Sequence, residues 1–165
     1  MSRSRDEIVR RIIDREGGVK DVNDGKGLTR WGQTPGWLTE FNLPIPTNAT
    51  DAALNYVEWM RVTGLDRLIG AEADSLADAV IDLAVHSGHV TAIKSLQRAI
   101  GAAPDGVIGP KTLALIVDRR VVAADVIAWR LEQQGNLIAR DPARYASNAH
   151  GWARRNAEHV RRLAR

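Results

Sequence analysis

Apolar residues recur at helical spacing over most of the chain. The first such stripe follows a Ser-x-x-Glu capping box and consists of Ile8, Val9, Ile12 and Ile13. Gly17 comes directly after it, and glycine is common beyond a helix C-terminus because it adopts the left-handed conformation at little cost. The pattern therefore predicts a first helix that ends at Glu16.

Further stripes predict several more helices. Their apolar residues are Leu54, Val57 and Trp59 or Met60, then Leu76, Val80, Leu83 and Ala84, and then Ile93, Leu96 and Ile100. Typical boundary residues accompany them, namely Thr50, a Ser75–Asp78 capping box, Gly101, and the prolines Pro35 and Pro110 at first helical positions. Two long helices are expected at about residues 121–138 and from the region of Trp152 to near the end.

Between Glu16 and Thr34 the pattern is different. The segments "VKDV" and "LTRW" flank "NDGKG" at residues 23–27, where the glycines can take positive φ. This arrangement predicts a small β-hairpin. The chain as a whole is therefore expected to have a mainly α fold with one small β-hairpin after the first helix.

The composition is that of an ordinary globular protein. A length of 165 residues suits one domain of one or two lobes, and 44% of the residues are hydrophobic and 26% charged. There is no cysteine, which excludes a disulfide framework and thiol chemistry. The first residues are charged and lack the apolar run of a signal peptide, and no stretch approaches the length of a membrane span. We therefore expect synthesis in the cytoplasm, and a separate release route if the protein acts outside it.

The net charge of +3 is unevenly distributed. Residues 140–165 contain seven arginines and two acidic residues, a net charge of +5, which leaves about −2 for the rest of the chain. Such a tail suits an anionic partner, such as nucleic acid, a membrane surface or a bacterial envelope. A solvated, arginine-rich helix face is the alternative, and the sequence does not decide between the two.

Glu16 is the first candidate for a chemical role. It lies where a helix exposes free carbonyl groups, the negative end of the helix dipole, which favours the acid form that a general acid needs. The hairpin brings Asp24 and Thr29 back past this helix end, so that an acid and a carboxylate plus hydroxyl could serve one glycosidic bond. Glu-Gly-Gly and Asn-Asp-Gly are also common in turns, so the spacing alone leaves a purely structural role open.

Residues 16–34, "EGGVKDVNDGKGLTRWGQT", resemble the signature of the glycoside hydrolase family 108 muramidases, the phage-type lysozymes that include secretion activator proteins. That signature consists of Glu-Gly-Gly, an aspartate-rich turn, Gly-Gly, Thr, two further residues and then Gly-Ile-Thr. The matching residues are Glu16, Gly17, Gly18, Asp21, Asp24, Gly27, Thr29, Gly32 and Thr34.

A second stretch, residues 80–116, is similar to the C-terminal peptidoglycan-binding region of that family. The matching residues are Ala84, Ser87, Gly88, Ala92, Leu96, Gln97, Asp105, Gly106, Gly109, Pro110 and Thr112. The segment "HGWARR" at residues 150–155 resembles the Gly-Trp and arginine that close the region. Two stretches in the same order as in the family make the resemblance specific.

The resemblance implies a lysozyme-like fold with a catalytic lobe at residues 1–72 and a helical peptidoglycan-binding region at residues 73–165, packed as one globular unit. It also implies an N-acetylmuramidase that hydrolyses the β-1,4 bond between N-acetylmuramic acid and N-acetylglucosamine. Glu16 would be the general acid, with Asp24 and Thr29 as its catalytic partners, and neither a metal nor an organic cofactor is implied. A monomeric phage or prophage endolysin, released to the cell wall by a holin, fits the lack of a signal peptide.

The chain departs from the family signature at several positions. The replaced residues are Val19, Lys26, Gln33 and His86, where the family has an aromatic residue, a glycine, an isoleucine and an asparagine. The hairpin is also one residue shorter, so that the second carboxylate is either Asp24 or Asp21. None of these departures affects Glu16.

Trp31 follows Thr29 on the hairpin, where its ring could bind a sugar face, although packing in the core is an equal alternative. The remaining tryptophans are expected to pack, and these are Trp37, Trp59, Trp129 and Trp152. His86 and His89 lack the acidic partner of a metal site or nucleophile system, so we expect a structural role for them.

A competing function is non-catalytic binding to the envelope or to nucleic acid through the basic tail. Such a binder would have no need for Glu16, Asp24 and Thr29 together. We therefore expect peptidoglycan glycan strands as the partner, with the anionic envelope as a further partner of the tail, and no nucleic acid.

Overall fold

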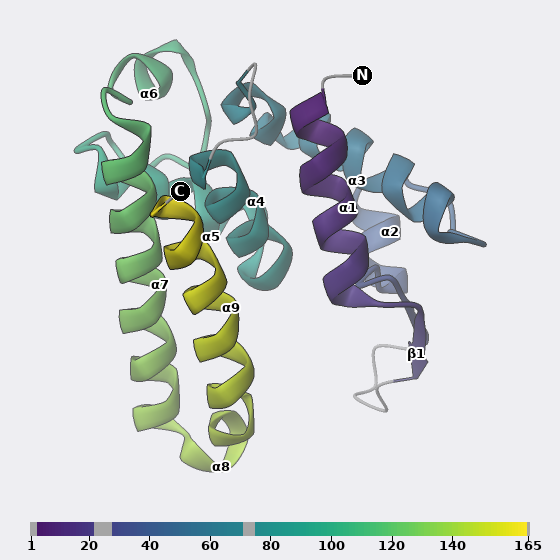
Figure 1. Ribbon diagram of the computed structural model, residues 1–165. Helices are drawn as coiled ribbons and strands as arrows, with labels where there is room; N and C mark the ends of the chain where they lie inside the picture. The colour runs from purple at the N-terminus through teal and green to yellow at the C-terminus, as the bar shows by residue number, and fades with distance from the viewer. Residues whose placement is uncertain (1–2, 22–27, 71–74, 165) are drawn as a thin grey trace. The chain divides into compact units, whose positions relative to one another are not determined.

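The structure is a computed structural model that describes residues 3–21, 28–70 and 75–164 (Figure 1). Within these residues the fold is mainly α with one two-stranded antiparallel sheet, which confirms the predicted fold class. Contacts divide the chain into two compact units, Met1–Ala73 and Asp74–Arg165. The resemblance had suggested a division after residue 72, and the packing of the two regions as one globular unit stays a prediction.

The first unit begins with α1 (Arg3–Glu16), which ends at the residue that the sequence pattern indicated. Gly17 takes a φ of 67°, and its N–H donates to the carbonyl of Ile13 at 3.1 Å. The other elements of this unit are β1 (Val19–Asp21), β2 (Leu28–Arg30), α2 (Pro35–Glu40), α3 (Ala49–Thr63) and the 3-10 helix η1 (Leu65–Leu68).

The core of the first unit lies where α1 packs on α3. Ile8 and Ile12 are each 1% exposed, and burial of such a side chain stabilises the fold by about 1.5–3 kcal/mol. An aromatic cluster joins α2 to α3, with ring centroids 5.4–6.5 Å apart, and consists of Trp37, Phe41, Tyr56 and Trp59. This core holds α1, α2 and α3 together.

The caps of α2 and α3 differ in how well the sequence predicted them. The hydroxyl of Thr34 accepts from the N–H of Trp37 at 3.2 Å, which confirms the start of α2 before Pro35. For α3 the expected cap, Thr50, is wrong, because Asn48 accepts from the N–H of Asp51 at 3.0 Å. Both residue types cap helices well, so the local sequence offered two suitable starts.

The predicted hairpin is present. Strands β1 and β2 pair antiparallel, with Val19 opposite Arg30, Lys20 opposite Thr29, and Asp21 opposite Leu28. The segment "NDGKG", and with it Asp24, lies outside the described residues. The strands carry the chain away from the end of α1 and then back toward it.

The second unit is helical in its described part. Its elements are α4 (Ser75–Ser87), α5 (His89–Ala99), α6 (Pro110–Ala114), α7 (Arg119–Arg140), α8 (Pro142–Tyr145), the 3-10 helix η2 (Ala146–Asn148) and α9 (Ala149–Leu163). Helix α4 contacts α5, α7 and α9, and α7 and α9 lie side by side (Figure 1). The two long helices expected from the sequence are therefore confirmed, with α7 two residues longer at each end than predicted.

A buried ionic cluster joins α4 to α7 and α9. Asp82 accepts from Arg130 at 2.7 Å and from Arg155 at 3.1 Å, and its carboxylate lies 3.0 Å from Nε2 of His159. Asp78 lies 3.3 Å from Nδ1 of the same imidazole and also pairs with Arg162. The sequence had assigned Asp78 to a capping box, whereas its carboxylate faces α9 and is 2% exposed.

The charges in this cluster shift each other's protonation. Burial by itself raises the pKa of Asp82, but the hydrogen bond from His159 and the neighbouring arginines outweigh it and hold that pKa well below its usual range. Burial likewise lowers the pKa of His159, yet hydrogen bonds to the Asp78 and Asp82 carboxylates raise it above its ordinary value. Both ring nitrogens face acceptors, which favours a doubly protonated imidazolium.

The second stretch that matched the family motif has a clear structural role. The side-chain amide of Gln97, 1% exposed, donates to Asp105 at 2.6 Å and to the carbonyl of Val107 at 3.0 Å. Its oxygen accepts from the N–H of Gly106 at 2.8 Å. One buried amide thus fixes the loop before α6, so these residues stabilise the second unit. In the described part of the chain no helix is long and apolar enough to cross a membrane.

Candidate active site

Glu16 is the last residue of α1 and is partly buried. Its position at the helix terminus follows from Gly17, whose left-handed backbone ends the helix at that point. Gly17 therefore makes Glu16 the last residue of the helix. The chain then turns into β1 and returns along β2. The Glu16 side chain lies close to Gly32, just after the end of β2.

A tight turn at residues 30–33 begins at the last residue of β2 and leads toward α2. The N–H of Gln33 donates to the carbonyl of Arg30 at 2.9 Å, and the N–H of Arg30 donates back to Gln33 at 3.1 Å. The two central residues, Trp31 and Gly32, have φ values of 48° and 79°. Positive φ at both positions is typical of a type I′ turn. A tryptophan in this conformation is strained by roughly 1–2 kcal/mol, and such strain is common at functional sites.

Gly32 brings this turn into contact with the candidate acid. A Cβ atom on Gly32 would lie 2.8 Å from Cγ and 3.1 Å from Cβ of Glu16. It would also lie 2.8 Å from the hydroxyl oxygen of Tyr56 on α3. Real Cβ atoms do not approach other atoms so closely, so the site requires a glycine here. The absence of a side chain lets the backbone of the turn close over Glu16.

Two sets of hydrogen bonds hold the turn in place. Trp31 donates its N–H to the carbonyl of Gly18 at 3.0 Å, and its own carbonyl accepts from Tyr56 at 2.8 Å. Gln33 is fully buried and donates to the carbonyl of Ala52 at 2.8 Å. These bonds tie the turn to the residues after α1 and to α3.

A buried pair of amides adds to this anchoring. Asn55 is 3% exposed, and its side-chain amide donates to Gln33 and to the carbonyl of Pro44, each at 2.8 Å. In the family signature that residues 16–34 resemble, the position of Gln33 is an isoleucine. This chain therefore has a buried polar pair where the signature has an apolar residue. Because each partner satisfies the other, the pair can be buried without a large cost.

Thr29 lies on β2, opposite Lys20. Its hydroxyl oxygen is buried and has no hydrogen-bond partner among the residues that the structure describes. An unpaired buried hydroxyl costs roughly 1–3 kcal/mol. A buried hydroxyl without a partner is the kind of feature that a binding or catalytic role would explain.

The structure does not place the second carboxylate. Asp24 lies outside the described residues, and for Asp21 the backbone in β1 is described but not the side chain. Of the residues predicted for catalysis, the structure therefore locates Glu16 at the helix end and Thr29 on the neighbouring strand. The choice between Asp24 and Asp21 stays open.

Trp31 is partly buried, and its backbone, as described above, contributes to the turn. Its role toward a sugar stays a prediction. Trp59 and Trp152 are 1% and 9% exposed, as expected for packing residues. His86 packs edge-to-face on Trp152 with ring centroids 5.8 Å apart, which fits the structural role expected for it.

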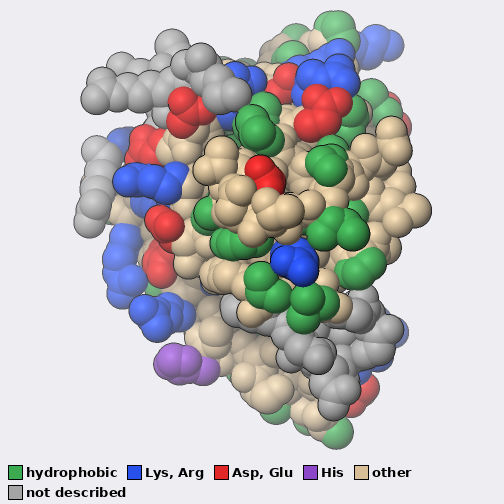
Figure 2. Space-filling model, turned by 90° about the vertical axis from the view of Figure 1, so that its right-hand side faces the viewer, with side chains coloured by type: hydrophobic (Ala, Val, Ile, Leu, Met, Phe, Trp, Pro, Cys, Tyr) green, Lys and Arg blue, Asp and Glu red, His purple; other side chains and the backbone are tan. Residues whose placement is uncertain are grey.

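Other surfaces of the described chain offer pockets that lack the candidate catalytic residues. One, of about 370 Å³, lies between α1 and α3, and another, of about 170 Å³, is lined by residues of α4, α5, α7 and α9. Hydrophobic side chains are scattered over the face shown in Figure 2. No group of three metal-binding side chains occurs among the described residues. Neither pocket is lined by Glu16, Thr29 or Trp31, and the region of Glu16 is a candidate site because of its motif residues and the tight turn that closes over the acid.

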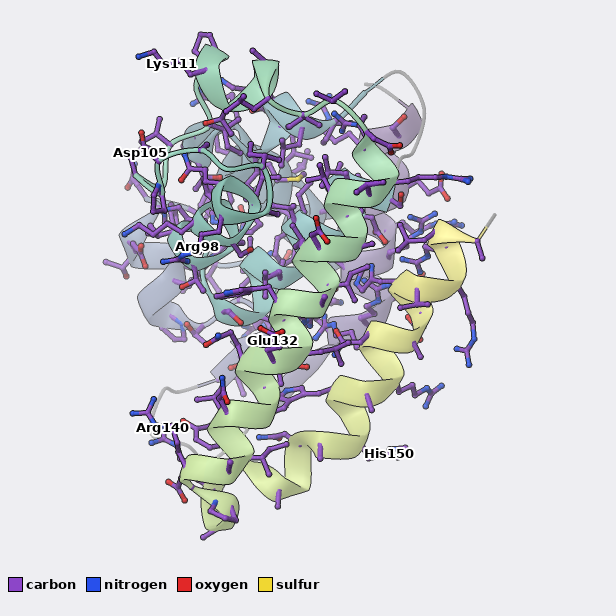
Figure 3. The ribbon with its side chains drawn as sticks, turned by 90° about the vertical axis from the view of Figure 1, so that its left-hand side faces the viewer. Arg98, Asp105, Lys111, Glu132, Arg140 and His150 are labelled. Carbon is purple, nitrogen blue, oxygen red and sulfur yellow. The ribbon has the colours of Figure 1, made fainter. Side chains whose placement is uncertain are left out.

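The arginines near the C-terminus fall into two classes. Arg155 and Arg162 pair with the buried carboxylates of α4, so they hold α9 in place. The others in the described chain are exposed, and they are Arg140, Arg144, Arg154 and Arg161. Arg140 projects from the end of α7 and His150 lies on α9 in Figure 3. Binding of an anionic surface through the exposed set stays a prediction.

The sequence did not identify Tyr56 or Asn55 as parts of this region. Their spacing on α3 is that of an ordinary helix face, and their partners lie 25 and 22 residues earlier in the chain. Gly32 directly after Trp31 was the one local signal, because Xaa-Gly is common in tight hairpin turns.

No family model matches the chain, and no curated protein does either. Solved structures do match. One of them is the structure of SagA from Brucella abortus, which is 25% identical to this chain. The match covers 97% of this chain and 94% of SagA, with a TM-score of 0.76. The fold described above is therefore shared with SagA over nearly the whole length of both chains.

Proposed function

We propose that this protein is a peptidoglycan hydrolase of the glycoside hydrolase family 108 type, an N-acetylmuramidase. It would cleave the β-1,4 bond between N-acetylmuramic acid and N-acetylglucosamine. The observation that carries the proposal is Glu16, held at the end of α1 against the glycine of a strained tight turn. The matching motifs in both halves of the sequence and the fold shared with SagA support it.

In the proposed reaction Glu16 protonates the glycosidic oxygen as the bond to the leaving sugar breaks. Positive charge develops at the anomeric carbon of the other sugar, where a carboxylate on the opposite side either activates a water or stabilises that charge directly. Asp24 or Asp21 would supply this carboxylate. Thr29, whose hydroxyl is buried and unpaired in the described chain, would bind the attacking water or a sugar oxygen.

Lysis of purified cell walls, followed as loss of turbidity, tests the proposal. Glu16→Gln should lower the rate by at least about 10²-fold, the usual scale for loss of a general acid, and should leave the melting temperature near that of the wild type. Asp14→Asn is the matched control, because Asp14 is an exposed acid two residues earlier on the same helix and should leave lysis unchanged.

The same assay assigns the second carboxylate. Asp24→Asn and Asp21→Asn should differ, and the variant that loses turnover identifies the partner of Glu16. A folded Glu16→Gln protein that lyses walls at a near-normal rate would contradict the assignment of Glu16 as the acid. A folded wild type that does not lyse walls would instead favour a non-enzymatic role, in which the protein binds the envelope or nucleic acid through its basic tail.

A further inference from the structure

Tyr56 lies in α3, far from the motif residues in sequence, yet its hydroxyl reaches the turn that closes over Glu16. Its side chain is 2% exposed, and its hydroxyl donates to the carbonyl of Trp31 at 2.8 Å. That carbonyl belongs to a residue with a φ of 48°, a conformation that few residues other than glycine adopt. The hydrogen bond therefore fixes a peptide group in an otherwise unfavourable orientation.

The next residue, Gly32, transmits this constraint to Glu16. The position of its missing Cβ is 2.8 Å from the Tyr56 hydroxyl oxygen and 2.8 Å from Cγ of Glu16. The tyrosine and the acid thus lie close to the same point of the backbone. A shift of the peptide between Trp31 and Gly32 would leave the Glu16 side chain without its neighbour on that side.

Other contacts in this region do not involve the Tyr56 hydroxyl. Gln33 remains tied to Ala52 and Asn55, and Arg30 and Gln33 still exchange their backbone hydrogen bonds. The ring of Tyr56 also packs against Trp37 and Trp59 without help from its hydroxyl. Removal of the hydroxyl alone should therefore disturb the turn locally and leave the first unit folded.

We propose that Tyr56 is a positioning residue for Glu16. Its hydrogen bond to Trp31 keeps Gly32 next to the side chain of the acid. The inference rests on the proposed function, since it assumes that Glu16 is the general acid. A displacement of about 1 Å at a reacting group can lower a rate by about 10²-fold, so a hydroxyl that does not touch substrate can still matter for turnover.

The test compares Tyr56→Phe with Tyr145→Phe, which changes the only other tyrosine of the chain, in the second unit. Initial rates are measured on soluble, un-cross-linked glycan strands of peptidoglycan. Tyr56→Phe should lower kcat by about 10- to 100-fold with KM within about twofold of the wild type. Tyr145→Phe should change neither constant.

A second readout needs no catalysis. The side-chain carboxyl carbon of Glu16 is followed by NMR in the folded protein, with Glu16→Gln used to assign its signal. Its chemical shift should change in Tyr56→Phe and stay unchanged in Tyr145→Phe. The melting temperature of both variants should stay within a few degrees of the wild type.

An unchanged kcat together with an unchanged Glu16 signal would overturn the positioning role. So would unfolding of Tyr56→Phe, because the hydroxyl would then hold the fold rather than the acid. Failure of the proposed function looks different. In that case the wild type would not cleave the glycan, or Glu16→Gln would cleave it at the wild-type rate, while the NMR comparison would still report whether Tyr56 positions Glu16.

Discussion

At the scale of single residues, the structure around Glu16 depends on the absence of a side chain at Gly32. This residue combines a φ of 79° with two side chains, those of Glu16 and Tyr56, close to where a Cβ atom would lie. Either property alone would favour glycine, and together they leave no room for a side chain. Gly64, at the end of α3, has a similar φ of 75°, but a Cβ there would come no closer than 3.9 Å to a side-chain atom.

This pair of glycines gives a matched experiment. Gly64→Ala should lose only the cost of a left-handed alanine, about 1–2 kcal/mol. Gly32→Ala should lose about 1–3 kcal/mol more, because its Cβ overlaps two side chains, and wall lysis should fall as Glu16 is displaced. Urea unfolding of both variants measures the difference. Equal losses at the two positions would mean that the Glu16 side chain yields to the added methyl group without cost.

The sequence predicted the residues whose roles are set locally. Glu16 is followed by Gly17, which ends the helix, so its position at the terminus could be deduced from neighbouring residues. Tyr56, Gln33 and Asn55 act through partners 11 to 25 residues away, and no local pattern contains that information. Trp31 illustrates the same limit, because its left-handed backbone follows from the turn as a whole.

At the scale of elements, the contact of α9 with α4 is the feature that the sequence described least well. The pattern correctly placed a helix in the last part of the chain. The face of α9 that contacts α4 carries His159 and two arginines, which bind Asp78 and Asp82. Hydrophobic periodicity detects only faces that are apolar. A helix face that buries charged residues against another helix is therefore wrongly interpreted as solvated.

The buried ionic cluster around Asp82 and His159 predicts how the free energy of unfolding depends on pH. The pKa of His159 is raised in the folded state, so its contribution is fully present below the ordinary imidazole value, about 6.5, and is lost as pH rises through the raised value. Asp82 has a lowered pKa, so its contribution is present above the ordinary carboxyl range and is lost as pH falls through the lowered value. Stability should therefore decline on both the acid and the alkaline side.

His159→Gln tests the alkaline side of this dependence. The free energy of unfolding of this variant should lie below that of the wild type near neutral pH, and the gap should narrow as pH rises and the wild-type imidazolium is lost. His150→Gln, at an exposed position on α9, serves as the control and should follow the wild type. A gap that stays constant over the alkaline range would show that the His159 charge contributes nothing.

At the scale of the whole molecule, the fold shared with SagA spans both units, while the positive charge is concentrated in the last part of the second. Two of the arginines there, Arg155 and Arg162, form ion pairs with buried carboxylates. The exposed arginines of α9, Arg154 and Arg161, are the ones able to attract an anionic envelope by long-range, screened forces.

Charge reversal at Arg154 and Arg161 should weaken lysis of whole walls at low salt, and the defect should shrink as salt rises. Cleavage of a short soluble glycan should stay nearly unchanged, because the residues proposed for catalysis lie in the first unit and the tail in the second. Arg98 and Lys111, exposed elsewhere in the second unit and labelled in Figure 3, give a control with the same change in net charge. An equal defect in both double variants would indicate that only net charge matters, and a defect independent of salt would indicate a structural role.

The central claim is that this protein hydrolyses the bond after N-acetylmuramic acid, with Glu16 as the acid. The most direct measurement identifies the new reducing ends in digested peptidoglycan, by borohydride reduction followed by mass spectrometry. The wild type should produce ends derived from N-acetylmuramic acid, at a rate that Glu16→Gln lowers by at least about 10²-fold. Ends derived from N-acetylglucosamine, or equal amounts of new ends from both proteins, would contradict it.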